Sequence, residues 1–352
     1  MPISWLLTAL PTLIAPGGSR TYKAAMTDSD NGQVADAAKG NWVDTIAPPA
    51  TRPYLRLSRA DRPIGTWLLL IPCWWGLGLA TLATGQFTLQ HLWIAIGCAI
   101  GAWLMRGAGC TWNDITDRDF DAQVARTRSR PIPSGQVSVK GAVAWMVLQA
   151  LLAVGILLSF PPLAISLGVA SLALVAIYPF AKRFTWWPQV FLGLAFNWGV
   201  LLAWAAATSA IGPAPILLYG AGILWTLFYD TIYAHQDVED DALIGVKSTA
   251  RLFGEDTARW LRWFLVLSVL LFSAGIILAL GASANPLQLA VALCFVWAFW
   301  LHMTWVFYRV DLEVASSLLG VFVSMWFAVL LGVLFVDVVD VVICRVCIGR
   351  CF

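Results

Sequence analysis

Two groups of aspartates stand out in a chain that is otherwise strongly apolar. They are Asp114, Asp117 and Asp121 in the stretch that starts at Asn113, and Asp230, Asp237 and Asp241 further along. The chain is 60% hydrophobic and 12% charged, yet 11 of its 20 acidic residues fall within 114–121 and 230–256. Carboxylates are costly to hold at a membrane. Their concentration in two segments therefore predicts a site that collects divalent cations.

The spacing of the aspartates suggests how they would reach one ion. Asp114, Asp117 and Asp121 follow an i, i+3, i+7 pattern, which places three side chains on one face of a helix. The i, i+7, i+11 spacing of the second group predicts a shared helix face as well. Mg²⁺ is bound by a few carboxylates together with water and substrate phosphates. We therefore expect Mg²⁺ as the cofactor.

Basic residues close to both groups indicate a phosphorylated substrate. Six carboxylates would repel a diphosphate unless divalent ions bridged the two. The guanidinium group of Arg and the ammonium group of Lys bind phosphate oxygens well. The first acidic group is followed by Arg126, Arg128 and Arg130, and the second by Lys247. Asn113 is expected to be a further polar ligand or a helix-positioning residue. The alternative is that these charges only solvate loops and orient the protein in the membrane.

An allylic diphosphate would place a further demand on the site. Its departure leaves a carbocation, which needs a dry pocket with aromatic faces. The 20 Trp, 18 Phe and 7 Tyr residues allow such a pocket but do not locate it.

Arg183 has two interpretations that the residues alone leave open. It ends the stretch Tyr178-Pro179-Phe180-Ala-Lys182-Arg183, in a different part of the chain from either acidic group. It is either an anchor that reaches the lipid headgroups or a clamp for a carboxylate of the acceptor. Its distance from both acidic groups in the sequence favours an acceptor contact over a diphosphate contact.

The elements that position these residues are long apolar runs. Each is about 18–25 residues, which suffices to cross the hydrocarbon core of a bilayer as a helix. We predict an all-α polytopic membrane protein with about nine such helices. They cover about 64–84, 91–111, 141–160, 163–181, 186–209, 212–229, 263–281, 287–308 and 315–336.

The distribution of Lys and Arg sets the expected orientation. With the N-terminus inside, 20 of the 22 basic residues fall on the inner side or at inner helix ends. Both acidic groups then face the cytoplasm of a bacterial inner membrane, with the mitochondrial inner membrane as the alternative. Four aspartates within residues 1–50 argue against a transit peptide over that whole segment. The net charge of +2 says little about partners, and no nucleic-acid partner is expected.

Three parts of the chain differ in composition. Residues 1–50 are expected to be a disordered or variable leader, 51–336 the transmembrane domain, and 337–352 an atypical tail rich in Val and Cys. The seven cysteines are scattered, and we expect no metal or redox role for them.

The motifs resemble those of the UbiA superfamily of intramembrane prenyltransferases. Its two signatures are similar to Asn-Asp-x-x-Asp-x-x-x-Asp at 113–121 and Asp-x-x-Tyr-Ala-x-x-Asp-x-x-x-Asp at 230–241. The branch that acts in ubiquinone biosynthesis is similar also at 61–66, 105–110, 126–135, 178–189 and 244–250. The resemblance covers about 52–310, whereas the leader and the end of the chain depart from the family pattern.

The resemblance implies nine helices around a central cavity and Mg²⁺-dependent transfer of a polyprenyl group from its diphosphate. The acceptor it implies is the ring carbon of 4-hydroxybenzoate ortho to the phenol. It further implies that Asp230 lies near the acceptor phenol, that Arg183 orients the acceptor carboxylate, and that Tyr233 belongs to the substrate site. The Mg²⁺–diphosphate would be held by Asp114, Asp117, Asp121, Asp237 and Asp241.

Two other functions remain open on the sequence. One is a sister prenyltransferase with another acceptor. The other is a cation-coupled membrane transporter, whose carboxylates would sit within broken helices near the middle of the bilayer. The acidic groups instead fall at the inner ends of the predicted helices, which favours the enzyme. Prenyl chain length and protein partners cannot be predicted.

Overall fold

The structure is a computed structural model that describes residues 40–124, 127–235 and 238–281, and isolated positions among 34–37 and 286–301. All of these residues belong to one compact unit, Gly32–Phe352. Every regular element in the described ranges is helical. The predicted all-α class is confirmed.

Seven spans are long and apolar enough to cross a membrane, so this is a multi-pass membrane protein. They correspond to the first seven predicted runs. The eighth run is described only at isolated positions. The ninth run lies outside the described residues, as do the tail and all of the first 33 residues. The spans are α3 (Ile64–Thr84), α4 (Leu89–Asp121), α5 (Val139–Leu157), α6 (Pro162–Phe184), α7 (Pro188–Asn197) with α8 (Gly199–Thr208), α9 (Pro213–Ala234), and α11 (Thr249–Phe253) with η3 (Gly254–Asp256) and α12 (Thr257–Leu280).

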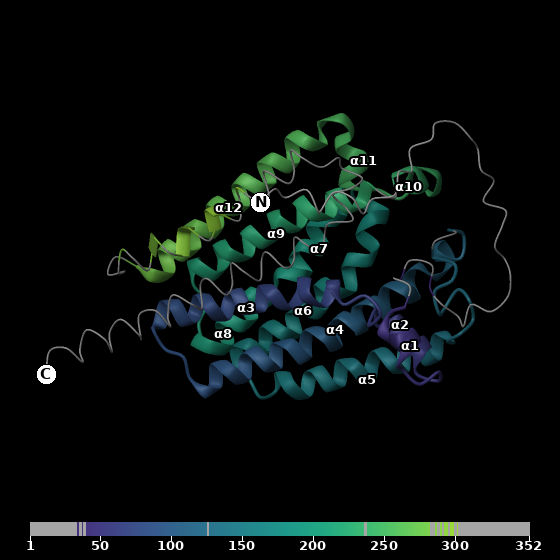
Figure 1. Ribbon diagram of the computed structural model, residues 1–352, viewed down its shortest axis with the longest axis horizontal. Coiled ribbons are helices and arrows are strands. Elements are labelled where there is room, and N and C mark those ends of the chain that lie inside the picture. Colours follow the sequence, from purple (N-terminus) through teal and green to yellow (C-terminus); the bar gives the residue numbers. More distant parts are fainter. Residues whose placement is uncertain are drawn as a thin grey trace, which may run out of the picture. The chain divides into compact units, whose positions relative to one another are not determined.

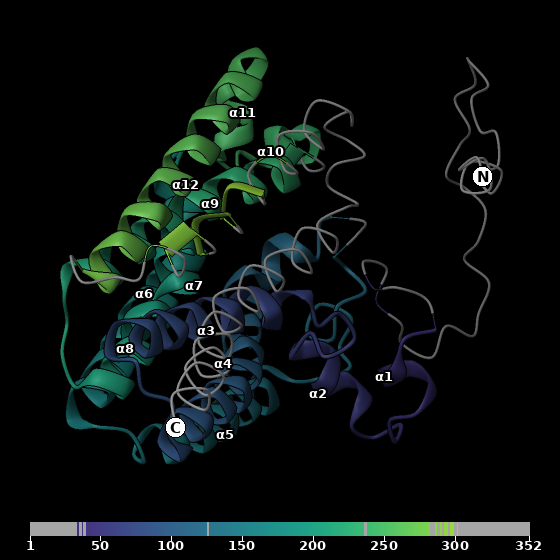
Figure 2. The same ribbon diagram turned by 60° about the vertical axis from the view of Figure 1, so that its left-hand side comes forward.

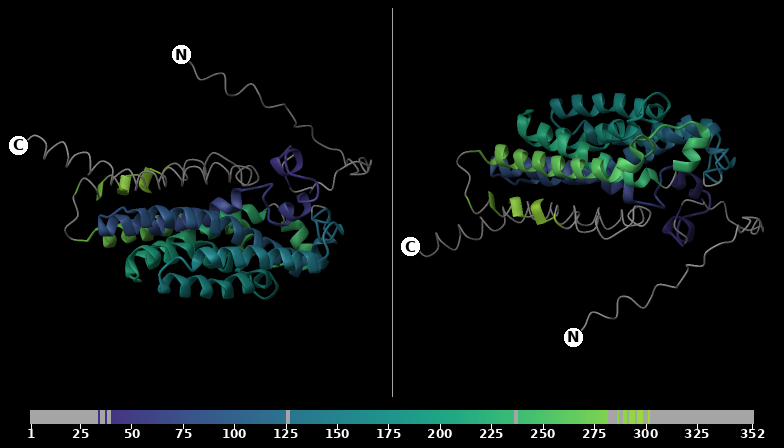
Figure 3. Two further views of the ribbon diagram at one scale, coloured as in Figure 1. Left: turned by 90° about the horizontal axis from the view of Figure 1, so that it is seen from below. Right: turned by 90° about the horizontal axis from the view of Figure 1, so that it is seen from above.

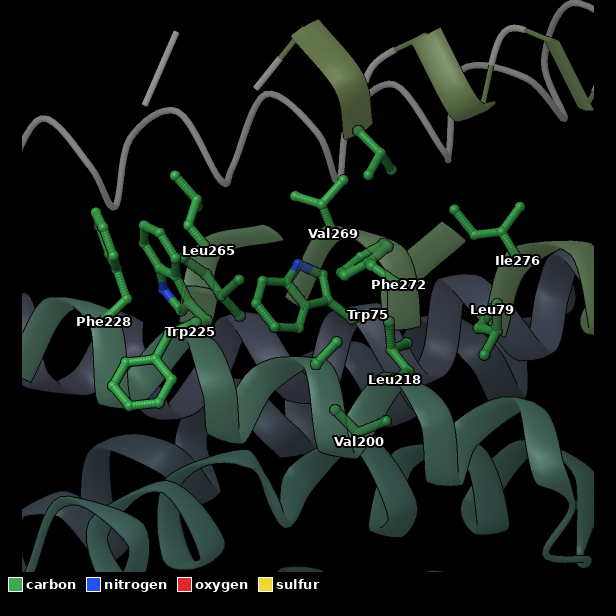
Figure 4. Close-up of a cluster of buried hydrophobic side chains, with 14 of the residues drawn as sticks. Trp75, Leu79, Val200, Leu218, Trp225, Phe228, Leu265, Val269, Phe272 and Ile276 are labelled. Atoms are coloured by element: carbon green, nitrogen blue, oxygen red, sulfur yellow. The ribbon is translucent and has the colours of Figure 1, made fainter. Parts of the chain in front are cut away.

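The long helices run side by side (Figures 1 and 2), and large side chains fill the space between α3, α9 and α12. Figure 4 shows Trp75 of α3 against Phe272 of α12, with Trp225 of α9 beside them. The rings of Trp75 and Phe272 meet edge-on, with centroids 5.4 Å apart. Aromatic burial of this kind fixes the separation of three helices.

The packing between α3, α4 and α8 is different in kind. Most of its buried residues are small, such as Cys73, Cys98, Ala102 and Ala203. Small side chains leave unfilled space between helices that larger ones would occupy. This part of the bundle therefore leaves room for a cavity.

Short helices gather at one end of the bundle, on the right in Figure 1 and again in both views of Figure 3. These are α1 (Trp42–Thr45) and α2 (Arg52–Leu57) before the first span, and α10 (Val238–Ile244) after α9. α4 ends in the same region, at Asp121. Two segments that are more than a hundred residues apart in sequence thus meet at this end.

The predicted single helix through the second acidic group is wrong. α9 ends at Ala234 and α10 begins at Val238, so Asp230 and Asp241 lie on different helices. Acidic side chains are unfavourable at a helix C-terminus and favourable in a first turn. Glu239 and Asp241 therefore stabilise the start of a new helix more than the continuation of α9.

Candidate active site

A polar cavity of about 350 Å³ opens at this end, among α4, α6, α9 and α10. It brings together residues of both acidic groups, as their placement on one side of the membrane predicted. Eight of the twelve predicted site residues line it: Asn113, Asp117, Asp121, Arg130, Asp230, Tyr233, Asp241 and Lys247. Two others, Arg126 and Asp237, lie outside the described residues.

The first acidic group lies on one buried face of α4, as its spacing predicts. Asp114, Asp117 and Asp121 are 0%, 1% and 8% exposed. Asp117 accepts from Lys182 Nζ at 2.5 Å and lies 3.3 Å from Arg183 Nη2. Two cations from the end of α6 therefore balance one carboxylate at the cavity wall.

Asp121 is balanced from the loop that follows α4. Arg130 Nη1 lies 2.9 Å from Asp121 Oδ2 and 3.5 Å from Asp114 Oδ1. The Thr127 hydroxyl donates to the Asp121 carbonyl at 2.9 Å, which holds the loop against the helix end. The loop thereby carries a guanidinium to the cavity wall.

Asp114, which the family resemblance predicts as a metal ligand, is not among the residues that line this cavity. Its carboxylate is fully buried, and Oδ1 lies 2.6 Å from Arg59 Nη2. Asp114 lies about one helical turn further from the end of α4 than Asp117 does. At that depth its carboxylate meets Arg59 of the segment before α3, whereas Asp117 lines the cavity.

Arg183 lies beside the first acidic group, although its position in the chain suggested a place away from it. The expectation that it stands apart from both acidic groups is wrong, because it contacts Asp117. It donates to the Thr116 carbonyl at 2.8 Å and sits between the rings of Phe120 and Phe180, 5.2 and 5.0 Å from their centroids. Arg183 and Asp117 are 66 residues apart in sequence, and the packing of α6 against α4 brings them into contact. Their separation in the sequence gave no sign of this contact.

The second acidic group reaches the cavity through α9, α10 and the loop to α11. Lys247 donates from its backbone N–H to the Lys182 carbonyl at 3.1 Å, which ties this loop to the end of α6. Arg251 donates to the Asp241 carbonyl at 3.2 Å and also bonds to the Val246 carbonyl. Gly245, at φ 76°, makes the turn between α10 and this loop.

A second, apolar cavity of about 210 Å³ is lined by residues of α3, α4, α5, α6, α7 and α8. Arg106 and Tyr178 line it among otherwise apolar and small side chains. Tyr178 donates to Asn113 Oδ1 at 3.4 Å, and Asn113 itself lines the polar cavity. The walls of the two cavities are therefore in contact through Asn113 and Tyr178.

Arg106 brings a positive charge to the apolar side of this junction. Its Nε is buried without a hydrogen-bond partner among the described residues, and its guanidinium lies 5.5 Å from the centroid of Phe196. It interacts electrostatically with Asp230. A buried donor without a partner carries a desolvation cost, which a bound anionic group would remove.

The donor set suits a hard cation that also holds a phosphate. In the described ranges no three His, Cys, Asp or Glu side chains come close enough to hold a metal by themselves. Asp117, Asp121, Asp230 and Asp241 nevertheless line one cavity together with Arg130, Lys182 and Lys247. One or two carboxylates, water and phosphate oxygens are what Mg²⁺ takes, so the residues present fit this ion.

Sequence reasoning missed several residues of this region. Lys182 lines the polar cavity and pairs with Asp117, but in the sequence it counted only toward the charge asymmetry. Gln189 lines it too and accepts from the Thr249 N–H at 3.2 Å. For Arg106, a charge within an otherwise apolar run was the available signal.

Comparison with known proteins gives a family match. The model of the UbiA prenyltransferase family matches residues 69–329. The chain is 43% identical to the mitochondrial 4-hydroxybenzoate polyprenyltransferase of Rattus norvegicus, over 94% of this chain and 88% of that protein. It is 45% identical to the Mus musculus protein of the same name, over 87% of this chain and 79% of that protein.

Solved structures share the fold. A UbiA homolog from Archaeoglobus fulgidus bound to GPP and Mg²⁺ superposes with a TM-score of 0.60 at 20% identity, covering 80% of this chain and 99% of that one. The apo structure of a UbiA homolog from Aeropyrum pernix K1 gives 0.58 at 23% identity, covering 78% and 98%.

Proposed function

Because the chain belongs to the UbiA prenyltransferase family, we propose that it transfers a polyprenyl group from polyprenyl diphosphate to 4-hydroxybenzoate. The bond between the first prenyl carbon and the diphosphate oxygen breaks, and a carbon–carbon bond forms ortho to the phenol. The ring then loses a proton and regains aromaticity. Relatives that carry this activity in their names are 43–53% identical, and the product belongs to ubiquinone biosynthesis.

The observation that carries the proposal is the junction of the two cavities. The polar cavity holds carboxylates and cations that suit a metal-bound diphosphate, and the apolar cavity in contact with it suits a hydrocarbon chain. Asn113 and Tyr178 connect them. A prenyl diphosphate has this same division, and its reactive carbon would lie at the junction.

The residues of the polar cavity would bind the diphosphate. Arg130, Lys182 and Lys247 supply cationic hydrogen bonds to its oxygens, as does Arg126 by its position in the chain. Asp117, Asp121 and Asp241 would hold Mg²⁺, with Asp237 added from the resemblance. The ion neutralises the diphosphate and makes it a better leaving group when bound.

The acceptor would enter from the junction with its phenol toward Asp230. The carboxylate of Asp230 can stabilise the charge that develops on the ring and phenol oxygen during attack. Tyr233, 40% exposed at the cavity mouth, borders the same space. The apolar side excludes water from the reacting carbon.

The experiment that tests the function uses the full chain in membranes or detergent micelles. Labelled 4-hydroxybenzoate, a polyprenyl diphosphate and Mg²⁺ are supplied, and the prenylated product is extracted and identified. Formation of 3-polyprenyl-4-hydroxybenzoate is the expected result. A product only with another aromatic or with a glycerol phosphate would indicate a sister enzyme, and cation flux without any product would indicate a transporter.

Arg106 is a better candidate than Arg183 for the acceptor carboxylate. Arg183 is already engaged by Asp117 and Thr116 and does not line either cavity. Arg106 lines the apolar cavity, and its Nε has no hydrogen-bond partner among the described residues. A charge-assisted hydrogen bond contributes roughly 1.5–3 kcal/mol. Arg106→Met should therefore raise the KM for 4-hydroxybenzoate about ten- to a hundredfold, with little change in the KM for the diphosphate.

Arg183→Met is the matched comparison. It should affect the diphosphate and Mg²⁺ dependence, since it removes a cation from Asp117. Steady-state kinetics with each substrate varied in turn separates the two. If Arg183→Met alone raised the KM for 4-hydroxybenzoate, the carboxylate would belong to Arg183 as the sequence suggested.

The membrane and the orientation are also proposals. Relatives named mitochondrial favour the mitochondrial inner membrane over a bacterial one, with the cavity facing the matrix because Lys and Arg concentrate on that side. A Ser134→Cys variant, in a background without other reactive thiols, should resist an impermeant reagent in mitoplasts and react after permeabilisation. Labelling before permeabilisation would overturn this orientation.

A further inference from the structure

A buried arginine from the segment before α3 reaches the first acidic group. Arg59 is 7% exposed and its Nη2 lies 2.6 Å from Asp114 Oδ1, while Nη1 donates to the Arg56 carbonyl at 3.1 Å. Its backbone is left-handed, with φ 56°. Such a conformation persists in a non-glycine residue only where its surroundings hold it.

Asp114 connects this arginine to the polar cavity without lining the cavity itself. It is 0% exposed, and its Oδ2 has no hydrogen-bond partner among the described residues. Arg130 Nη1 lies 3.5 Å from its Oδ1 and 2.9 Å from Asp121 Oδ2. One guanidinium is thus placed between two carboxylates, only one of which faces the cavity.

We propose that Arg59 is a positioning residue, which neutralises Asp114 so that Arg130 stays on Asp121 at the wall of the diphosphate site. A buried carboxylate that loses its cation takes the nearest remaining one. Without Arg59, Asp114 draws Arg130 inward and away from the cavity. This inference rests on the proposed function, because it assigns Arg130 to the diphosphate.

The same geometry gives Asp114 a role other than metal binding. Its charge balances Arg59 and sets the position of Arg130, which differs from the direct ligand role that the family resemblance implied. Removing the charge of Asp114 together with Arg59 would leave the pair of Arg130 with Asp121, at 2.9 Å, in place. The double replacement should therefore be less harmful than the loss of Arg59 alone.

The test compares Arg59→Met, Asp114→Asn and the double variant in the full chain. Arg59→Met should raise the KM for polyprenyl diphosphate about tenfold and leave the KM for 4-hydroxybenzoate near the wild-type value. Adding Asp114→Asn should bring the KM for the diphosphate most of the way back to the wild-type value. A second readout is the rise in Tm on adding an unreactive prenyl thiodiphosphate with Mg²⁺. That rise should shrink in Arg59→Met and return in the double variant.

Two further variants keep the result interpretable. Arg59→Gly removes the guanidinium and accepts φ 56° without steric cost, so it replaces Arg59→Met if that protein does not fold. Asp44→Asn is the control, because it removes the buried partner of Arg56 (2.7 Å) in the same segment. It should lower Tm without changing the KM for the diphosphate.

The outcomes separate this inference from the proposed function. If the wild type neither prenylates 4-hydroxybenzoate nor binds the thiodiphosphate, the proposed function fails before the variants are compared. If the wild type does both, but the Arg59 variants have the wild-type KM for polyprenyl diphosphate, the inference is overturned and the proposed function stands. A double variant as impaired as Arg59→Met, or an Asp114→Asn variant as inactive as a metal-ligand variant, also overturns it.

Discussion

Replacing Asp117 with Asn is expected to lower prenyl transfer by at least about a hundredfold, since a lost metal contact costs several kcal/mol of transition-state stabilisation. Asp117 is 1% exposed and lines the polar cavity, where Lys182 and Arg183 contact its two oxygens. Asn keeps the shape and removes the charge that would hold Mg²⁺. The two cations then remain without their carboxylate, so the variant should show weaker Mg²⁺ dependence as well as a low kcat.

Asp119 is the matched control for this change. It lies two residues away on the same helix, is 83% exposed at its side chain, and pairs with the neighbouring Arg118 at 3.4 Å. Surface ion pairs of this kind contribute at most about 1 kcal/mol. Asp119→Asn should retain nearly full activity in the same extraction assay. Comparable losses in both variants would mean that the charge of α4, and not the cavity, decides activity.

Removal of divalent ions is expected to abolish activity to the limit of detection. Asp117, Asp121, Asp230 and Asp241 face one cavity, and their combined charge opposes a diphosphate unless a divalent cation lies between them. Excess EDTA in the wild-type assay should stop product formation, and Mg²⁺ above the chelator concentration should restore it.

Spermidine is a suitable control for simple charge screening, because it carries positive charge without taking oxygen ligands as a metal does. It should restore little or nothing in the presence of EDTA. Full turnover in EDTA would contradict the metal-bridged diphosphate and leave Arg130, Lys182 and Lys247 as the whole binding site. Recovery with spermidine would show that screening alone is sufficient.

The sequence was sufficient wherever a local rule decides the structure. Apolar runs of span length become helices in a membrane because a helix satisfies all of its own backbone hydrogen bonds there. Each of the first seven predicted runs overlaps an observed span, although the second span ends later and the seventh begins earlier than predicted. The spacing of Asp114, Asp117 and Asp121 placed them on one buried side of α4. The acidic motifs also predicted which chemistry to look for.

The break after α9 shows where a local rule was misapplied. Asp230 and Asp241 were expected on one helix, but the chain ends α9 at Ala234 and starts α10 at Val238. The acidic residues at the start of α10 are themselves a helix-start signal. The sequence therefore contained a signal for a new helix at α10, and the i, i+7, i+11 spacing was wrongly taken as evidence for one continuous helix.

Partners that come from different helices were decided by the tertiary structure alone. Arg59 meets Asp114 across 55 residues, and Arg183 meets Asp117 across 66. No spacing rule relates such positions, because their separation is fixed by how the helices pack. Arg106 became the candidate for binding the acceptor carboxylate in the same way, because only the packing of the helices shows that it lines a cavity. The residue types determined that this is a membrane protein with a carboxylate and cation site, and the packing determined which carboxylate faces the cavity and which is held behind it.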